Sequence, residues 1–298
     1  MFVDLLWVIG GLVLLYFGAE WLVKGASDIA LKLGVSPLVV GLTVVAFGTS
    51  APELLVCLDA NANGSSGMAL GNIIGSNICN IALVLGFAAL ITPIVISKQI
   101  IKRELPILIV ATLVFLAMLI GLGNPEGLQR WEGGVLFAGI LLYVVSSFLK
   151  SRKEGKDDSN EFSAEDIEAV KQAGVGKFLL SLAYILVGGV ALYFGSGWLV
   201  EHGEILAVDH LHVDPAVVAL ILIAFGTSVP ELATSVVAAR KGEGDIILGN
   251  AVGSCIFNLL AVMGVTALVK PVTYEGIQSL DLWAVSYTHL TLPTICSV

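Results

Sequence analysis

A short motif that places a proline and a glutamate inside an apolar run occurs twice in this chain. Residues 45–54 read VAFGTSAPEL and residues 223–232 read IAFGTSVPEL, so eight of ten positions are identical at a separation of 178 residues. A second motif, LGNxxGSxxxN, follows each copy at residues 70–80 and 248–258, and 19 residues separate the glutamate from the first asparagine in both. Two motifs kept at one offset indicate an internal duplication, so the chain must fold into two matching halves.

The apolar composition predicts that both halves lie in a membrane. Hydrophobic residues make up 57% of the 298 residues and charged residues 13%, with a mean hydropathy of +0.94. The apolar runs reach the roughly 20 residues that a helix needs to cross a bilayer. The first run, residues 5–23, lacks a basic segment before it and a small-residue cleavage site, so we interpret it as a retained helix and not a signal peptide. The four cysteines have neither disulfide nor metal spacing.

The runs predict an all-α polytopic membrane protein with about eight complete helices. We place them near 5–23, 36–58, 68–91, 105–123, 132–149, 178–200, 213–239 and 245–269. Five helices per repeat would give the two copies opposite orientations, which is the inverted-repeat architecture of secondary transporters.

The predicted organisation is a first repeat, a linker, a second repeat and a tail. The first repeat spans residues 1–150 and the linker 151–177. The second repeat, 178–285, contains helices six to eight and the start of a ninth, so we expect it to be truncated relative to the first. Residues 286–298 are polar, contain a proline and are too short to span a membrane, so we expect a non-native tail that does not belong to the fold.

Basic residues predict the orientation. With alternating spans, 13 of the 15 Lys and Arg residues fall on one side, and only Arg130 and Lys270 fall on the other. The positive-inside rule then places the 151–177 linker in the cytoplasm and the N-terminus outside, in an inner (plasma) membrane.

The two motifs carry the candidate chemistry. A carboxylate at the membrane centre costs at least ~2.5–3.5 kcal/mol, so Glu53 and Glu231 are expected to be functional. Pro52 and Pro230 each free the carbonyl four residues earlier. Helical spacing places Ala46 and Thr49 beside Glu53, Ala224 and Thr227 beside Glu231, and Ser50 and Ser228 one turn away.

The second motif adds two polar faces with a spacing of four residues. One face carries Asn72, Ser76 and Asn80, and the other carries Asn250, Ser254 and Asn258. Together the motifs offer only hard oxygens, which suit Ca²⁺ or Na⁺, and Ca²⁺ takes roughly 6–8 of them. Asn72 and Asn250 could equally be interhelical glue. A cluster of acids and histidines at 201–212 could hold a metal, but a solvated outside loop is the simpler interpretation.

At these residues the chain resembles a known family. Residues 48–53 and 226–231, each followed by GNxxGS, are similar to the two alpha-repeats of the cation/calcium exchanger superfamily, nearest its prokaryotic sodium/calcium exchangers. The resemblance implies ten helices in two inverted repeats with ion sites between helices 2, 3, 7 and 8. It also implies a calcium site made by Glu53, Glu231 and the Thr49 and Thr227 carbonyls. The sodium ligands that it implies flank this site, with two asparagines in the middle. They are Ala46, Ser50, Ser76, Ala224, Ser228 and Ser254, around Asn80 and Asn258.

The function expected from this resemblance is antiport of calcium against sodium by alternating access. Two carboxylates in a low-dielectric cleft repel one another when the site is empty, so only a loaded site should switch easily between the two faces. A calcium/proton exchanger, a potassium-dependent exchanger, a channel and an intramembrane protease are alternatives, of which the first two use the same carboxylates. We expect no enzyme activity and no cofactor; the expected partners are calcium, sodium and the lipid bilayer, with no nucleic acid and no obligate protein partner.

Overall fold

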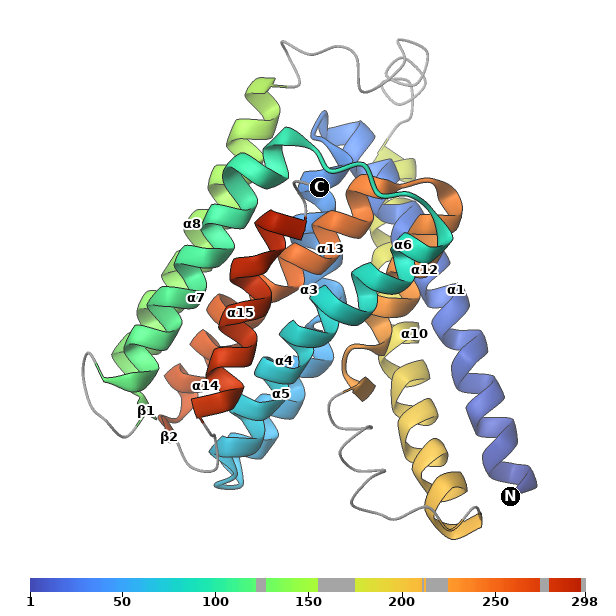
Figure 1. Cartoon of the computed structure of the whole chain (residues 1–298). Coiled ribbons are helices and arrows are strands. Elements are labelled where there is room, and N and C mark those ends of the chain that lie inside the picture. Colours follow the sequence, from blue (N-terminus) through green and yellow to red (C-terminus); the bar gives the residue numbers. More distant parts are fainter. Residues whose placement is uncertain (122–126, 155–174, 211, 213–224, 274–278, 296–298) are drawn as a thin grey trace.

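The computed structural model describes residues 1–121, 127–154, 175–210, 212, 225–273 and 279–295 (Figure 1). Almost all of them are helical, with five π-helical segments, η1 to η5, inserted in or next to α-helices. The elements of the first half are α1 (Phe2–Leu33), α2 (Pro37–Val40), η1 (Gly41–Val45), α3 (Ala46–Thr49), α4 (Ala51–Ala62), α5 (Ser66–Cys79), η2 (Asn80–Val84), α6 (Leu85–Ile91), η3 (Ile100–Glu104), α7 (Leu105–Ile120), β1 (Gly127–Leu128) and α8 (Arg130–Glu154). Those of the second half are α10 (Val175–Ile205), η4 (Leu206–His210), α12 (Val229–Lys241), α13 (Gly244–Phe257), η5 (Asn258–Val262), α14 (Met263–Val269), β2 (Val272–Thr273) and α15 (Ser279–Ile295).

Six helices of the described residues are long and apolar enough to cross a membrane, and a bent pair gives a seventh. The bent pair is 37–49 with 51–62, and its two parts meet at 43°. The predicted class, an all-α polytopic membrane protein, is therefore confirmed.

Helices α1 and α10 pack side by side along one flank of the molecule and run in opposite directions (Figure 1). Glycines let their backbones touch: a Cβ added at Gly18 would lie 3.0 Å from the Gly188 carbonyl oxygen, and one added at Gly188 would lie 2.7 Å from the Gly18 oxygen. Similar contacts join Gly11 to Gly195 and Gly25 to Ser181. Because the residue number rises in one helix as it falls in the other, the first helices of the two repeats are antiparallel, as an inverted duplication requires.

Helices α7 and α8 form the opposite flank, and the motif-bearing helices lie between the flanks (Figure 1). The centre is largely apolar, with Leu42, Ile73 and Phe115 among its fully buried side chains, and it also holds the motif residues and a few other polar groups such as Thr112 and His289. A two-residue antiparallel strand pair joins the loop before α8 to the loop after α14, with Gly127 opposite Thr273.

The first motif breaks its helix at a fixed place. Ser36 caps α2 by accepting a hydrogen bond from the Val39 amide, and Pro37 occupies the first turn. The chain then runs through η1 and α3 to Ser50, whose backbone leaves the helical region at φ −84° and ψ 5°. Helix α4 restarts at the next residue with Pro52 in its first turn. The break follows from this proline, which has no amide proton and cannot continue the ladder.

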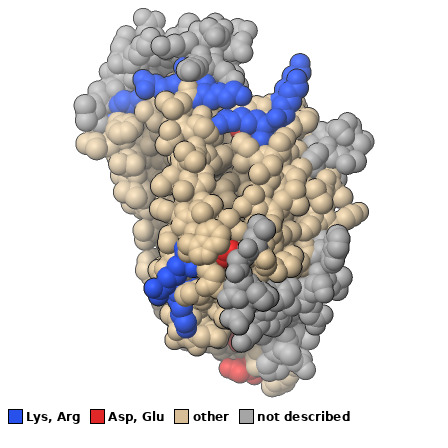
Figure 2. Space-filling model, turned by 90° about the vertical axis from the view of Figure 1, so that its left-hand side faces the viewer, with Lys and Arg blue, Asp and Glu red and all other residues tan. Residues whose placement is uncertain are grey.

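Basic side chains gather at one end of the molecule, the upper end in Figure 2. Arg103 and Lys102 lie at the start of the α7 span, and Lys150 and Arg152 lie near the end of α8. Of the described basic residues, Arg130 and Lys270 lie at the other end, where Arg130 donates a hydrogen bond to the Val269 carbonyl.

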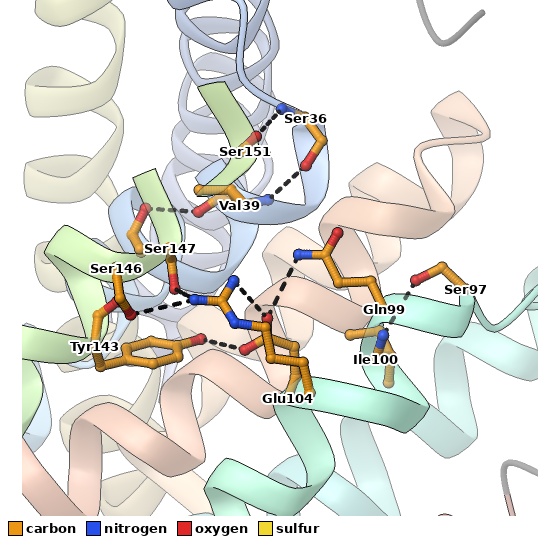
Figure 3. A network of polar contacts seen from close by, with 12 residues as sticks. Ser36, Val39, Ser97, Gln99, Ile100, Glu104, Tyr143, Ser146, Ser147 and Ser151 are labelled. Atoms are coloured by element: carbon orange, nitrogen blue, oxygen red, sulfur yellow. Dashed lines mark hydrogen bonds and ion pairs between the residues drawn. The ribbon is translucent and has the colours of Figure 1, made fainter. Parts of the chain in front are cut away.

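A buried polar network holds this basic end together (Figure 3). The fully buried Glu104 accepts a hydrogen bond from the Tyr143 hydroxyl at 3.0 Å and pairs with Arg103 at 3.4 Å. The Ser151 hydroxyl of α8 accepts a bond from the Ser36 amide at 2.9 Å. The network therefore fixes the entrance of the broken helix to the α7–α8 flank.

Several predicted boundaries are corrected. Helix α1 is longer than the predicted 5–23, and helix α10 with η4 continues to residue 210, so residues 201–210 are helical and not a loop. The chain also does not leave the bundle after residue 285, because α15 continues to Ile295 and buries Val285 and Leu292 against α5 and α7. Residues 286–295 thus pack on the bundle, which the sequence did not lead us to expect, while their non-native origin stays a prediction. Residues 155–174 of the linker and 213–224 of the predicted seventh helix lie outside the described residues.

Candidate functional site: a pocket of buried oxygens between the two halves

Glu53 and Glu231 occupy the same position in matching helices. Each is the third residue of its helix, behind a serine at the helix start and a proline, and each is fully buried. The first turn of a helix carries free amide groups and the positive end of the helix dipole, which favour a negative charge. The broken helices therefore explain how two carboxylates can be held inside the bundle.

Hydrogen bonds cross between the halves around these carboxylates in a symmetric pattern. The Thr49 hydroxyl of α3 donates to the Asn250 amide oxygen of α13 at 3.1 Å and lies 3.4 Å from the Ser254 hydroxyl. In the matching positions, the Thr227 hydroxyl donates to the Asn72 amide oxygen at 3.1 Å and lies 3.1 Å from the Ser76 hydroxyl. Each threonine thus contacts the second motif of the opposite repeat.

The carboxylates themselves are poorly satisfied by protein groups. Glu231 Oε1 accepts one hydrogen bond, from Ser50 at 3.2 Å, and its Oε2 has no partner among the described residues. Both oxygens of Glu53 lack a hydrogen-bond partner there too, although Ser76, Thr227 and the carboxylate of Glu231 are neighbours. No Lys or Arg of the described chain forms an ion pair with either glutamate. Buried charges are normally paired or bound to metal, so these two carboxylates are suited to binding cations.

Asn80 and Asn258, the predicted centre of the pocket, are fully buried and begin π-helical segments, η2 and η5, that lie 178 residues apart. π-bulges inside α-helices are frequent at functional sites. Asn258 Nδ2 donates to the Asn77 amide oxygen at 3.0 Å, whereas Asn258 Oδ1 and both polar atoms of Asn80 have no partner among the described residues. Three buried polar atoms of these two asparagines thus have no hydrogen-bond partner in the described part of the chain.

Pro52 and Pro230 cannot donate a backbone hydrogen bond to the Gly48 and Gly226 carbonyls, and the side chain beside this carbonyl differs between the two halves. The Gly226 carbonyl, four residues before Pro230, accepts a hydrogen bond from the buried Ser196 hydroxyl of α10 at 2.7 Å. The position that matches Ser196 in the first repeat is Ala19, which has no hydroxyl to offer the Gly48 carbonyl.

The structure therefore brings most of the predicted residues together. Eleven are described, and those joined by the contacts above are Thr49, Ser50, Glu53, Ser76, Thr227, Glu231 and Ser254. The side chain of Asn258 contacts Asn77, which is not one of the predicted residues. Ser228 and Asn80 are fully buried with unpartnered polar atoms, and the carbonyl of the buried Ala46 accepts the Ser50 amide within the helix at 3.0 Å. Ala224 lies outside the described residues.

A cavity of about 800 Å³ reaches this pocket from one side. It opens between α4, α5 and α10, and Asn72 and Thr227 lie on its wall close to the carboxylates. Asp59, Glu201 and Glu204 also line it, so its wall carries negative charge. Such a passage suits cations that enter the pocket from the end of the molecule where α10 ends.

Sequence reasoning missed four residues that hold the pocket: Cys57, Asn77, Ser196 and Ser235. Two of them had a signal, because Cys57 and Ser235 each lie four residues after a site glutamate and are 178 residues apart. The signal was weak, since the two residues differ in type.

Fold and site together define a multi-pass membrane protein with a pocket of buried oxygens between two inverted repeats. The comparisons with known proteins are consistent with this class. Residues 3–149 and 180–298 match the family described as "Sodium/calcium exchanger protein". CaxA of Alkalimonas amylolytica is 41% identical over 278 residues, which cover 91% of this chain and 82% of that protein. The sodium/calcium exchanger MaX1 of Methanosarcina acetivorans is 33% identical over 91% of this chain and 84% of its own.

A solved structure of the sodium–calcium exchanger NCX_Mj superposes with a TM-score of 0.81 at 29% identity and covers 99% of this chain and 91% of its own. The chain belongs to the sodium/calcium exchanger protein family. Members of this family are cation transporters and not an enzyme class.

Proposed function

We propose that this protein is a secondary antiporter that exchanges Ca²⁺ for Na⁺ by alternating access, and that the oxygen pocket carries both ions. The observation that supports it best is the pair of buried carboxylates, one from each half, whose oxygens mostly have no partner among the described residues. Two buried like charges are costly, and one Ca²⁺ or several Na⁺ would neutralise them. A loaded pocket can then be enclosed and exposed to the other side, whereas an empty one resists closure.

In this proposal the carboxylates of Glu53 and Glu231 and the carbonyls of Thr49 and Thr227 hold calcium. The flanking oxygens hold sodium, and the two asparagine amides complete the centre. The flanking residues are Ala46, Ser50, Ser76, Ala224, Ser228 and Ser254, and the central ones are Asn80 and Asn258. The donors are hard oxygens throughout, as Ca²⁺ and Na⁺ prefer, and the described residues hold no cluster of three His, Cys, Asp or Glu that would favour a transition metal.

The neutral amides at the centre favour sodium without potassium. An asparagine offers one neutral oxygen where a carboxylate would bring a full charge. The central pocket then holds the two charges of Glu53 and Glu231, which balance one Ca²⁺ without a second cation. A third carboxylate would favour an additional monovalent ion.

Flux measurements test the coupling ion. In proteoliposomes, ⁴⁵Ca²⁺ uptake should follow an outward sodium gradient, and it should persist when choline replaces potassium on both faces. Loss of uptake without potassium would contradict the charge argument. Uptake driven by a pH gradient alone would assign the protein to calcium/proton exchange, the main alternative.

We also propose an inner (plasma) membrane orientation with the N-terminus outside and the 151–177 linker in the cytoplasm, because the basic end should face the cytoplasm. The cavity beside α10 would then open to the outside. A cysteine at Asn63 should react with an impermeant thiol reagent in intact cells, and one at Lys98 should be protected. The opposite pattern would invert the assignment.

A further inference from the structure

The side-chain amides of Asn72 and Asn250 are held from behind by residues that have no assigned role. Asn72 Nδ2 donates to the Cys57 thiol at 3.5 Å, and Asn250 Nδ2 donates to the Ser235 hydroxyl at 3.1 Å. Both holding residues lie on the helix of the site glutamate, one turn beyond it, and both are fully buried. The contacts are therefore equivalent in the two halves.

These contacts decide which end of each amide faces the pocket. Because Cys57 donates its own proton to the Ala69 carbonyl at 3.4 Å, its sulfur can accept the Asn72 amide proton. The Asn72 oxygen is thereby turned toward Thr227, which donates to it. A rotated amide would instead place two N–H donors against the threonine hydroxyl.

The orientation of the Asn72 amide also determines how the Thr227 and Ser76 hydroxyls donate their protons. Thr227 has a single proton, and when that proton goes to Asn72 its oxygen can only accept from Ser76, 3.1 Å away. Ser76 then donates its proton to Thr227, so the lone pairs of the Ser76 oxygen stay available to a cation. With Asn72 rotated, the order reverses and the Ser76 proton is free to point at the cation.

We propose that Cys57 is a positioning residue for ion exchange: it fixes the direction of the Asn72 amide, and through Thr227 it keeps the Ser76 oxygen ready to accept a cation. Ser235 holds the Asn250 amide in the same way, but the Thr49 hydroxyl beside it also faces the Val45 and Ala46 carbonyls at 3.2 and 3.3 Å. Asn250 has a second support as well, because its Nδ2 also donates to the Glu231 carbonyl at 3.2 Å. A carbonyl can only accept, so Asn250 stays oriented even without Ser235. Among the described residues, Asn72 has no second acceptor of this kind, so the first half depends on a single thiol.

The test compares equivalent changes in the two halves and rests on the proposed exchange function. In Cys57→Ala, KM for Ca²⁺ should rise about three- to tenfold with the maximal rate within about twofold, the size expected for one buried hydrogen bond. Ser235→Ala should raise KM by less than about twofold, because the Glu231 carbonyl remains. Cys57→Ser should keep the wild-type KM to within about twofold, since a hydroxyl fills this role in the second half.

Two further variants guard against nonspecific effects. Cys57→Val fills the volume without accepting a proton and should behave like Cys57→Ala, so a KM rise cannot be put down to a cavity. Ser146→Ala, at the far end of α8, should leave KM unchanged. Equal KM changes in Cys57→Ala and Ser235→Ala, or no change in Cys57→Ala and Cys57→Val, would overturn the proposal.

Ca²⁺ binding to the detergent-solubilised protein, measured by calorimetry, separates this inference from the proposed function. Wild-type protein that binds Ca²⁺ without exchanging it would refute the antiporter, whereas the positioning role would still require weaker binding in Cys57→Ala than in Ser235→Ala. Exchange by the wild type with equal Ca²⁺ affinity in both variants would refute the positioning role alone.

Discussion

The two halves of this molecule present matching site residues but fix them unequally. In the second half, Glu231 accepts a bond from Ser50, Asn258 is held by Asn77, and the freed Gly226 carbonyl is held by Ser196. In the first half, the oxygens of Glu53 and the amide of Asn80 have no partner in the described part of the chain. The two halves therefore carry matching motif residues but differ in the hydrogen bonds that hold them.

The cavity shows the same inequality. It opens beside α4 and α5 of the first half, where Gly197 and Glu204 of α10 line it. In the matching place beside α12, α1 carries Glu20 and Ser27 at these positions, and they bond to Lys241 at 2.7 Å and to Glu243 at 3.3 Å. The open side, where the cavity lies beside α4 and α5, is thus the side where the Glu53 oxygens have no partner among the described residues. On the other side, which we call the closed side, side-chain contacts join α1 to Lys241 and Glu243. This arrangement suits a transporter caught with one of two equivalent entrances open.

The largest effect is expected from the glutamates, where the halves should be equivalent. Glu53→Gln and Glu231→Gln keep nearly the same oxygens but remove one charge from the pocket, so each alone should abolish Ca²⁺ exchange, a loss of more than about 100-fold, as for unpairing a buried charge. Sodium-driven ⁴⁵Ca²⁺ uptake measures it. Near-normal uptake in either variant would show that one half suffices and that the shared two-carboxylate site is wrong.

A smaller change should separate the central asparagines. Asn258→Asp adds a third carboxylate and places it against the Asn77 amide oxygen that now accepts from Asn258. We expect exchange to become sensitive to potassium or protons, with uptake reduced about tenfold at neutral pH for one disrupted charged contact. Asn80→Asp meets no such oxygen in the described structure, so it should gain the same sensitivity with a smaller loss. Equal losses in both would mean that the Asn77 contact does not distinguish the halves.

The sequence predicted the fold class and the proximity of the two motifs, because hydropathy and a duplication can be recognised from residue types alone. The sequence did not predict the residues that hydrogen-bond to these motifs from other parts of the chain. Nothing in the sequence places Ser196 against the Gly226 carbonyl, because this contact depends on how α10 packs against the broken helix. The packing of residues 286–295 was not predicted for a related reason: their few apolar positions, such as Leu292, are buried by neighbours that lie far away in the chain.

A stability measurement tests the unequal treatment of the freed carbonyls. Ser196→Ala leaves the Gly226 carbonyl without its hydroxyl partner and should lower the free energy of unfolding by about 1–3 kcal/mol, the cost of an unsatisfied buried group. Ala19→Ser offers the first half the missing hydroxyl and should be neutral or slightly stabilising. Thermal unfolding in detergent reports both. A stable Ser196→Ala protein would mean that water or another donor already serves this carbonyl.

The smallest effect on the free energy of unfolding is expected from the surface ion pair between Lys241 and Glu20 on the closed side. Lys241 and Glu20 are each about one-third exposed, with exposed side-chain fractions of 30% and 36%, so solvent weakens their attraction even at 2.7 Å. Lys241→Met should therefore lower the free energy of unfolding by less than about 1 kcal/mol, and 1 M salt should erase most of the difference. Glu20→Gly, which copies Gly197 of the open side, should cost somewhat more, because glycine also weakens the interior of α1 by about 1 kcal/mol. The two variants should be compared at high salt, where the ion pair no longer contributes to stability. The loss of unfolding free energy that the glycine causes by weakening the helix should remain in Glu20→Gly. If Lys241→Met instead lost several kcal/mol independently of salt, the contact would be a buried structural bond. The closed side would then differ from the open side by more than a surface tie.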